Sequence, residues 1–212
     1  MDELKRIAEK VEKGKHIEVP EAVKKALDTG IAPYEVFING LQAGLFAVGE
    51  RFKSGEAFIP EVLLSARAMR AGMDVLRPLL IEKGNKPLGK VVLGTVKDDL
   101  HGIGKNMVGM MLEGAGFQVI DVGINVSSEK FAEAIQYEDP DILALSALLS
   151  TTVPYLETTI EILKEKDLRD KVKVLVGGAP VTEEYAMEIG ADGYAPDAVS
   201  SVGKAREILK LN

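Results

Sequence analysis

Apolar residues recur every three or four positions through the first 80 residues, which is the spacing of one face of an α-helix. Glycine and proline interrupt this pattern and mark helix ends. The pattern predicts four helices, near residues 4–13, 20–29, 33–54 and 60–80. Four amphipathic helices joined by short loops are typical of a small bundle. We therefore expect residues 1–86 to form a helical-bundle domain.

A polar stretch with Gly and Pro, residues 82–89, predicts a linker, and beyond it the period of the apolar pattern changes. Strands are expected at residues 90–96, 117–122, 142–146, 172–176 and 193–195, and helices near 105–113, 128–136, 154–166, 183–189 and 198–210. Alternating strands and helices predict a parallel sheet covered on both faces. We expect residues 89–212 to form a flavodoxin-like, Rossmann-type α/β domain with strand order 2-1-3-4-5.

Composition narrows the class of protein. The 212 residues suffice for one large or two small domains, and 46% hydrophobic residues indicate a real core. A net charge of −7 argues against nucleic acid or an anionic membrane as a partner. No apolar run approaches the roughly 18 residues of a membrane span. The first six residues lack the apolar core of a signal peptide, and cysteine is absent, so we expect a cytoplasmic protein.

The loop after the first expected strand contains the most informative residue, His101. The chain has two histidines and no cysteine, so it cannot form an ordinary zinc site from protein ligands alone. A metal at His101 must bring most of its other ligands with it. Asp99 is placed to accept the second imidazole N–H, as carboxylates do for ligating histidines. The alternative is structural: Asp98 or Asp99 caps the helix that begins near Gly104.

Two further loops are unusual, and both follow strands expected to lie near the first. One carries Ser146-Ala-Leu148-Leu-Ser150-Thr151-Thr152, and the other carries Gly177-Gly178. In the expected strand order the carboxyl ends of strands 1, 3 and 4 are neighbours, where such sheets bind ligands. Small and hydroxyl-bearing residues there predict an open trench. Taken singly, each loop also suits an ordinary role in helix capping or chain reversal.

Three ligand sites of similar sheets do not fit these loops. A phosphoacceptor receiver needs an Asp at the end of the third strand, where this chain has Ser146. A flavin-phosphate loop after the first strand is rich in Ser and Thr rather than Asp and His. Gly102-x-Gly104 lacks the third glycine of a dinucleotide fingerprint, since Met107 stands at its position.

The motifs in combination resemble a known family. Asp99-x-His101-x-x-Gly104, Ser146-x-Leu148 and Gly177-Gly178 are similar to the signature of the corrinoid-binding domain of cobalamin-dependent methionine synthase, methyltransferase corrinoid proteins and cobalamin mutases. In the first half, residues 48–69 resemble the helical cap that covers the upper face of the corrin in the methyl-transferring members. Together the two resemblances span nearly the whole chain.

The resemblance implies a cofactor and its contacts. Cobalamin or a related corrinoid would bind base-off, with His101 replacing the dimethylbenzimidazole as lower axial ligand of cobalt, and with Asp99 and Ser146 forming a relay to the other imidazole nitrogen. The trench residues implied to bind the cofactor are Asp99, His101, Gly102, Ile103, Gly104, Ser146, Leu148, Thr151, Gly177 and Gly178. The cap residues implied at the upper face are Phe52, Phe58, Ile59, Val62 and Leu63, of which Val62 and Leu63 also suit ordinary bundle core.

The resemblance also implies a function. The protein would be a corrinoid methyl carrier, cycling between methyl-cobalt(III) and cobalt(I) and without catalytic residues of its own. It would accept a methyl group from a substrate-specific methyltransferase and pass it to a second methyltransferase acting on tetrahydrofolate or a thiol. A reductive activase is a further implied partner.

Two rival interpretations share part of the pattern. The small subunit of an adenosylcobalamin-dependent mutase has the second-half motifs but lacks the methyl-cap pattern of residues 48–69. A light- or cobalamin-responsive regulator needs an added DNA-binding module, for which this acidic chain has neither the length nor a basic patch. The residues do not indicate which methyl donor the carrier serves.

Overall fold

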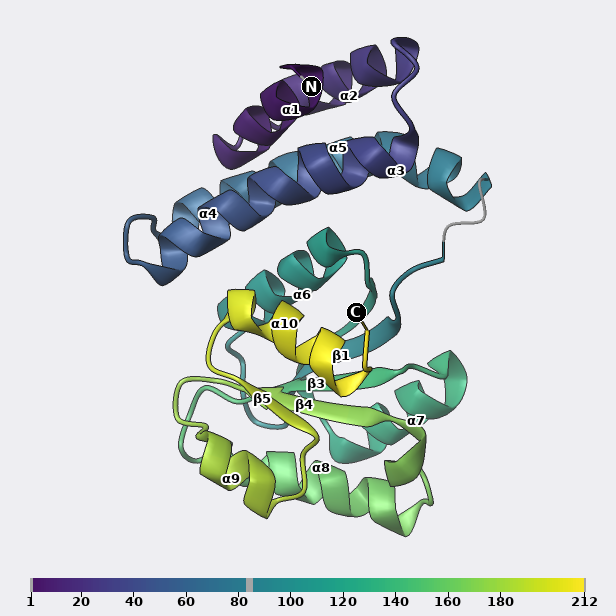
Figure 1. Ribbon diagram of the computed structural model, residues 1–212. Helices are drawn as coiled ribbons and strands as arrows, with labels where there is room; N and C mark the ends of the chain where they lie inside the picture. Colours follow the sequence, from purple (N-terminus) through teal and green to yellow (C-terminus); the bar gives the residue numbers. More distant parts are fainter. Residues whose placement is uncertain (1, 83–85, 212) are drawn as a thin grey trace. The chain divides into compact units, whose positions relative to one another are not determined.

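The computed structural model describes residues 2–82 and 86–211, without the side chains of residues 2 and 81. Two compact units make up the chain, Met1–Lys86 and Pro87–Asn212. Figure 1 shows the first as helical and the second as a sheet flanked by helices. The predicted linker, residues 82–89, includes residues 83–85, which lie outside the described residues.

The first unit contains the predicted helices. Its elements are α1 (Asp2–Glu12), α2 (Glu18–Asp28), α3 (Pro33–Val36), the π-helical η1 (Phe37–Gln42), α4 (Ala43–Lys53) and α5 (Ile59–Glu82). α3, η1 and α4 follow one another without a break, so the predicted third helix is one rod with a π-helical section. α1 packs against α2, η1, α4 and α5, and α5 also packs against α2 and α4. The predicted four-helix bundle is confirmed.

Two glycines in the third helical rod allow close packing against α1. A Cβ atom on Gly44 would lie 2.3 Å from the carbonyl oxygen of Ala8, and one on Gly40 would lie 3.0 Å from Cγ2 of Ile7. Any larger side chain would push the helices apart, because interiors are packed without spare volume. The apolar stripes of the helices then meet in a core that includes Ile7, Leu41, Leu45, Val48 and Leu76, all fully buried.

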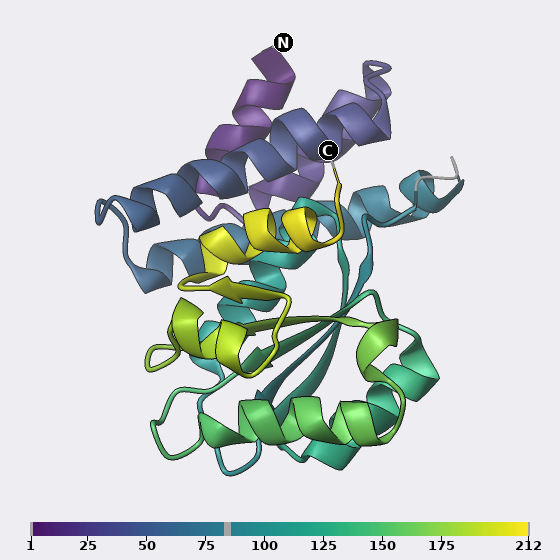
Figure 2. The same ribbon diagram turned by 60° about the horizontal axis from the view of Figure 1, so that its bottom comes forward.

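The second unit is a five-stranded parallel sheet with the order β2-β1-β3-β4-β5. Its strands are β1 (Lys90–Val96), β2 (Gln118–Val126), β3 (Ile142–Ser146), β4 (Lys173–Gly177) and β5 (Gly193–Ala195). Its helices are α6 (Ile103–Ala115), α7 (Ser128–Glu138), α8 (Pro154–Glu165), the short 3₁₀ helix η2 (Arg169–Lys171), α9 (Glu183–Glu188) and α10 (Ala198–Ile208). Figures 1 and 2 show α6 and α10 on one face of the sheet and α7, α8 and α9 on the other. The predicted flavodoxin-like strand order is confirmed.

β2 is longer than the sequence pattern predicted. Its pairing with β1 continues to Val96 opposite Val126, through two shifts of register. The predicted strand ended at residue 122, and the structure extends it past two polar residues, Asp121 within the prediction and Asn125 beyond it. Because β2 is an edge strand, these polar side chains reach water, so polarity did not end the strand here.

The face of the sheet toward α7 and α8 is the larger part of the core of this unit. It is built from alternate residues of β1, β3 and β4 packed on apolar residues of both helices, among them Phe131, Leu156 and Ile160, which are fully buried. None of the helices within residues 2–82 and 86–211 has the length and apolar character that crossing a membrane requires.

Candidate functional site

The register of the sheet brings the three unusual loops together. Thr95 of β1 pairs with Ser146 of β3, which pairs with Gly177 of β4. Each of these three paired residues is the last or next-to-last residue of its strand. The loops that follow them therefore leave the sheet side by side at its carboxyl edge, as the strand order predicted.

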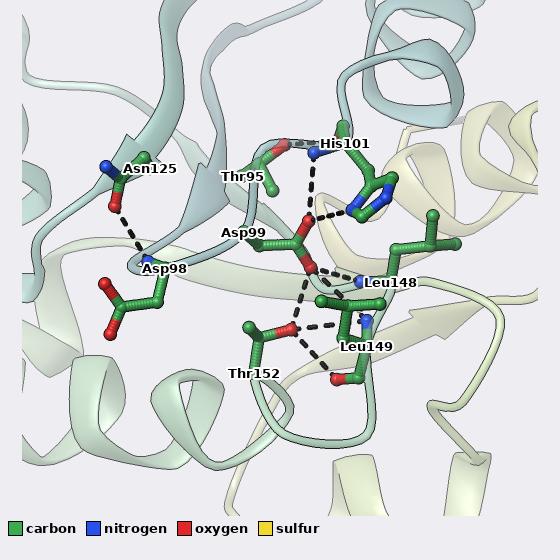
Figure 3. A network of polar contacts seen from close by, with 8 residues as sticks. All are labelled: Thr95, Asp98, Asp99, His101, Asn125, Leu148, Leu149 and Thr152. Carbon is green, nitrogen blue, oxygen red and sulfur yellow. Dashed lines mark hydrogen bonds and ion pairs between the residues drawn. The ribbon is translucent and has the colours of Figure 1, made fainter.

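Asp99 lies at the centre of this edge, and its carboxylate is fully buried (Figure 3). Its Oδ1 accepts the His101 backbone N–H at 3.0 Å and faces the His101 Nδ1 at 2.8 Å. Its Oδ2 accepts the Leu148 N–H at 2.6 Å and the Thr152 hydroxyl at 2.8 Å. One carboxylate thus joins the loop after β1 to the loop after β3.

These contacts keep Asp99 ionised. Burial of the carboxyl group opposes ionisation, but hydrogen bonds from the N–H groups of Leu148 and His101, from the Thr152 hydroxyl and from the His101 ring outweigh it. Together they hold the pKa of Asp99 well below its usual range. An ionised carboxylate accepts only, so the Nδ1 that faces it carries the proton.

His101 is consequently oriented for binding a ligand. With the proton on Nδ1, the lone pair of a neutral imidazole is on Nε2, and the side chain is 49% exposed. The Thr95 hydroxyl, itself buried, donates to the His101 carbonyl oxygen at 3.1 Å and ties the backbone to β1. No group of three or more His, Cys, Asp or Glu side chains that could hold a metal occurs in the described ranges. A metal at His101 must therefore bring its other ligands.

The relay was predicted to continue from Asp99 through Ser146, and this part needs correction. The hydroxyl bonded to Asp99 is that of Thr152, which the sequence analysis did not select. The Thr152 N–H donates to the Leu149 carbonyl at 2.9 Å, and this turn folds the Thr152 side chain back over Asp99. A turn cannot be placed from hydrophobic periodicity, so the Ser-Thr-Thr run was the only signal. A contact of Ser146 with the cofactor stays a prediction.

Two glycines of the trench are required by the packing of the chain, whereas a third, Gly104, is not. A Cβ on Gly178 would lie 1.8 Å from the Ala147 carbonyl oxygen, at a φ of +134°, and one on Gly177 would lie 2.7 Å from the Ala195 carbonyl oxygen. Both are needed for the chain itself to pack. A Cβ on Gly104 would meet no protein atom within 4 Å. The absence of a side chain there leaves open space in the first turn of α6, three residues after His101.

Several large apolar side chains at this edge of the sheet remain partly exposed. They are Leu100, Ile103, Ile124, Leu148 and Leu149, each at least 41% exposed. Such a cluster is unusual for side chains of this size and marks a binding surface. Of the other predicted trench residues, Thr151 is exposed, whereas Gly102 and Ser146 are half-buried.

The predicted upper-face residues lie in the first unit, at the end of α4, just before α5 and in the first turns of α5. Phe58 and Ile59 are 70% and 42% exposed, Phe52 and Leu63 are half-buried, and Val62 is 1% exposed. Val62 therefore belongs to the bundle core. Contact of the other four with a cofactor stays a prediction.

The exposed position of Phe58 is held by polar contacts. Glu61 accepts the Phe58 N–H at 2.9 Å and pairs with Arg51, which also pairs with Glu12, both at 3.3 Å. These contacts anchor the loop between α4 and α5 to α1. The exposed ring of Phe58 is therefore attached to a backbone that these contacts hold in place.

Comparison with known proteins agrees with this arrangement. Two family models, each described as a B12 binding domain, match residues 3–77 and 89–203. A corrinoid protein of Desulfitobacterium hafniense is 43% identical over 212 residues, 99% of this chain and 97% of that protein. A dimethylamine corrinoid protein of Methanosarcina barkeri is 44% identical over 208 residues, 97% of each chain.

Solved structures show the same arrangement of elements. A cobalamin-binding protein from Desulfitobacterium hafniense aligns with a TM-score of 0.80 at 32% identity, over 97% of this chain and 98% of that one. The methanol:cobalamin methyltransferase complex of Methanosarcina barkeri contains a chain that aligns with a TM-score of 0.83 at 28% identity, over 99% of this chain and 80% of that one. Because both halves match family models and the relatives match end to end, this chain belongs to the family of methyltransferase corrinoid proteins.

Proposed function

We propose that this protein is a corrinoid methyl carrier that binds cobalamin or a related corrinoid base-off, with Nε2 of His101 as the lower axial ligand. The observation that carries the proposal is the pairing of His101 with Asp99. One imidazole nitrogen faces a buried carboxylate at 2.8 Å, and the half-exposed ring stands at the ligand-binding edge of the sheet.

The residues present fit such a cofactor. A corrin ring supplies four nitrogen ligands to its cobalt, so a single histidine is the donor set that the protein must add. When bound, the cobalt would supply the methyl-transfer chemistry by alternating between methyl-cobalt(III) and cobalt(I). The apolar side chains at this edge of the sheet suit the flat face of the ring, and the open space at Gly104 suits a displaced nucleotide tail.

Asp99 would tune how strongly His101 donates. A carboxylate that accepts the Nδ1 proton fixes the tautomer and makes Nε2 a better donor. The Leu148 N–H and the Thr152 hydroxyl hold that carboxylate from its other side. In this proposal Thr152 takes the place in the relay that the resemblance assigned to Ser146.

The partners follow from the carrier role. The relatives include dimethylamine and trimethylamine corrinoid proteins, and one matching structure is a methyltransferase complex. We therefore expect a substrate-specific methyltransferase as the first partner, with methylamine systems the first to test. A second methyltransferase with a tetrahydrofolate or thiol acceptor, and a reductive activase, complete the expected set.

Replacing the proposed ligand tests the assignment of His101. Holo-protein labelled with ¹⁵N-histidine and carrying cobalt(II) should show splitting from one axial nitrogen in its electron paramagnetic resonance spectrum. The substitution His101→Ala should abolish that splitting, whereas His16→Ala should leave it intact. A wild-type spectrum from His101→Ala would remove the ligand assignment.

The carrier role is tested separately, by methyl transfer. Methylated holo-protein alone should hold its methyl group, and addition of a cognate methyltransferase with an acceptor should remove it. Carbon-skeleton rearrangement with a large mutase subunit, without any methyl exchange, would instead support the rival mutase interpretation.

A further inference from the structure

The carboxyl end of β2 lies beside the His101 loop and belongs to none of the sequence motifs. Its Asn125 contacts the neighbouring backbone at two points. The Asn125 Oδ1 accepts the Asp98 N–H at 2.8 Å (Figure 3), and the Asn125 N–H donates to the Asp99 carbonyl oxygen at 3.0 Å. These two hydrogen bonds hold the backbone of Asp98 and Asp99, which precede His101 in the loop.

The backbone at Asp98 needs this support because of its conformation. Asp98 has a φ of +62° and Asn125 a φ of +52°, both in the left-handed region that residues other than glycine rarely adopt. Asp98 is exposed and its carboxylate accepts the Tyr155 hydroxyl at 2.7 Å, whereas the next side chain, Asp99, is fully buried. The turn at Asp98 thus directs one carboxylate outward and the other inward.

The end of β2 that carries Asn125 is itself anchored to the helix after His101. Lys105 of α6 has a side chain only 3% exposed and forms an ion pair with Asp121 of β2. The other Asp121 oxygen accepts the Gly123 N–H at 2.9 Å, two residues before Asn125. Ile124 lies against Gly102, where a Cβ would come within 3.3 Å of it. These contacts therefore hold the end of β2 and the His101 loop in fixed positions relative to each other.

We infer that Asn125 is a positioning residue for the axial ligand, an inference that rests on the proposed function. Asn125 fixes the backbone of Asp98 and Asp99. That fixed backbone points the Asp99 carboxylate at both the Leu148 N–H and the His101 ring. Without the side-chain oxygen of Asn125, the carboxylate and the imidazole it orients have more freedom, so the bond from His101 to cobalt weakens.

Competition by cyanide measures that bond. Protein carrying cyanocobalamin is titrated with cyanide, because the second cyanide must displace the lower axial ligand to give the dicyano form. Asn125→Gly keeps the left-handed backbone and removes the acceptor, so the half-conversion concentration should fall about fivefold, the effect of one hydrogen bond. Asn125→Asp keeps an acceptor oxygen and should stay within about twofold of wild type. Asp139→Gly is the matched control, a left-handed residue with a φ of +47° at the far end of α7.

The outcomes separate this inference from the proposed function. Absence of the ¹⁵N-histidine splitting in wild-type protein defeats the proposed function itself. A normal splitting with equal cyanide midpoints for wild type and Asn125→Gly overturns the role of Asn125, as does an equal fall in Asn125→Asp or Asp139→Gly. Hydrogen exchange of the wild-type protein gives a test that needs no variant. The Asp98 amide should be protected although its residue is exposed, and rapid exchange there would also overturn the inference.

Discussion

The amino and carboxyl ends of the parallel strands each carry a carboxylate that forms several hydrogen bonds, half-buried Asp192 at one end and fully buried Asp99 at the other, and the two have different partners. At the amino edge, Asp192 accepts the Val174 N–H at 2.8 Å and pairs with Arg169 at 2.7 Å and Lys173 at 3.0 Å. At the carboxyl edge, Asp99 accepts three backbone N–H groups and a hydroxyl, and its titratable partner is a half-exposed histidine.

The two carboxylates differ in whether their partners keep an atom free to bind a ligand. Burial opposes ionisation of Asp192, and the Val174 N–H, Lys173 and Arg169 outweigh it, so its pKa is lowered. Its charge is then matched by cations of the chain itself, which suits a group that only ties β4 and β5 together. The Asp99 charge meets an imidazole whose second nitrogen stays open. A satisfied carboxylate with fixed cations indicates structure, whereas one that orients an exposed donor indicates a site.

The sharpest test of the carboxyl edge compares two of its glycines. Gly178→Ala should lower the free energy of unfolding by about 3 kcal/mol, because its Cβ would collide with Ala147 and its φ is left-handed. Gly104→Ala should raise that free energy by less than about 1 kcal/mol, as helix propensity predicts, and should weaken corrinoid binding. Urea unfolding of apo-protein and a corrinoid titration measure both. Unchanged corrinoid affinity of Gly104→Ala would show that the open space there is not used.

The helical unit allows a similar comparison between a buried side chain, Val62, and an exposed one, Phe58. Val62→Ala should lower the free energy of unfolding by about 2 kcal/mol, because the side chain is 1% exposed. Phe58→Ala should change it by less than about 0.5 kcal/mol, because the ring is 70% exposed. If Phe58 covers the cofactor, methyl-cobalt photolysis should nevertheless be faster in Phe58→Ala. Photolysis at the wild-type rate would remove Phe58 from the cap assignment.

The smallest expected effect comes from the amino edge and depends on pH. Asp192→Asn should cost about 1.5 kcal/mol of unfolding free energy at neutral pH and leave corrinoid binding unchanged. A carboxyl group with a lowered folded-state pKa stabilises the fold above its unfolded pKa, and that stabilisation is lost as pH falls through the folded value. The difference between wild type and Asp192→Asn should therefore shrink below about pH 4. A difference that persists at lower pH would show that the charge of Asp192 contributes nothing.

Much of the fold could be predicted because periodicity reports burial directly. The helices, the strands and the strand order were predicted, and from them the meeting of the three loops at one edge. The contact of Asp99 with His101 was also predictable, because two residues in one short loop have few arrangements available. The end of β2 was misplaced, and the strand continues through the polar Asn125, which is tolerated because β2 is an edge strand.

Sequence by itself determined the family, the parallel sheet and the candidate ligand, because these depend on residue types and local spacing. Only the tertiary structure decided that Thr152 rather than Ser146 bonds to Asp99, that Gly178 is required by Ala147, and that Asn125 supports the His101 loop. Each of these contacts joins residues far apart in the chain, or depends on the path of a turn. Hydrogen bonds and close packing are set within a few tenths of an ångström, and only the assembled backbone positions groups that finely.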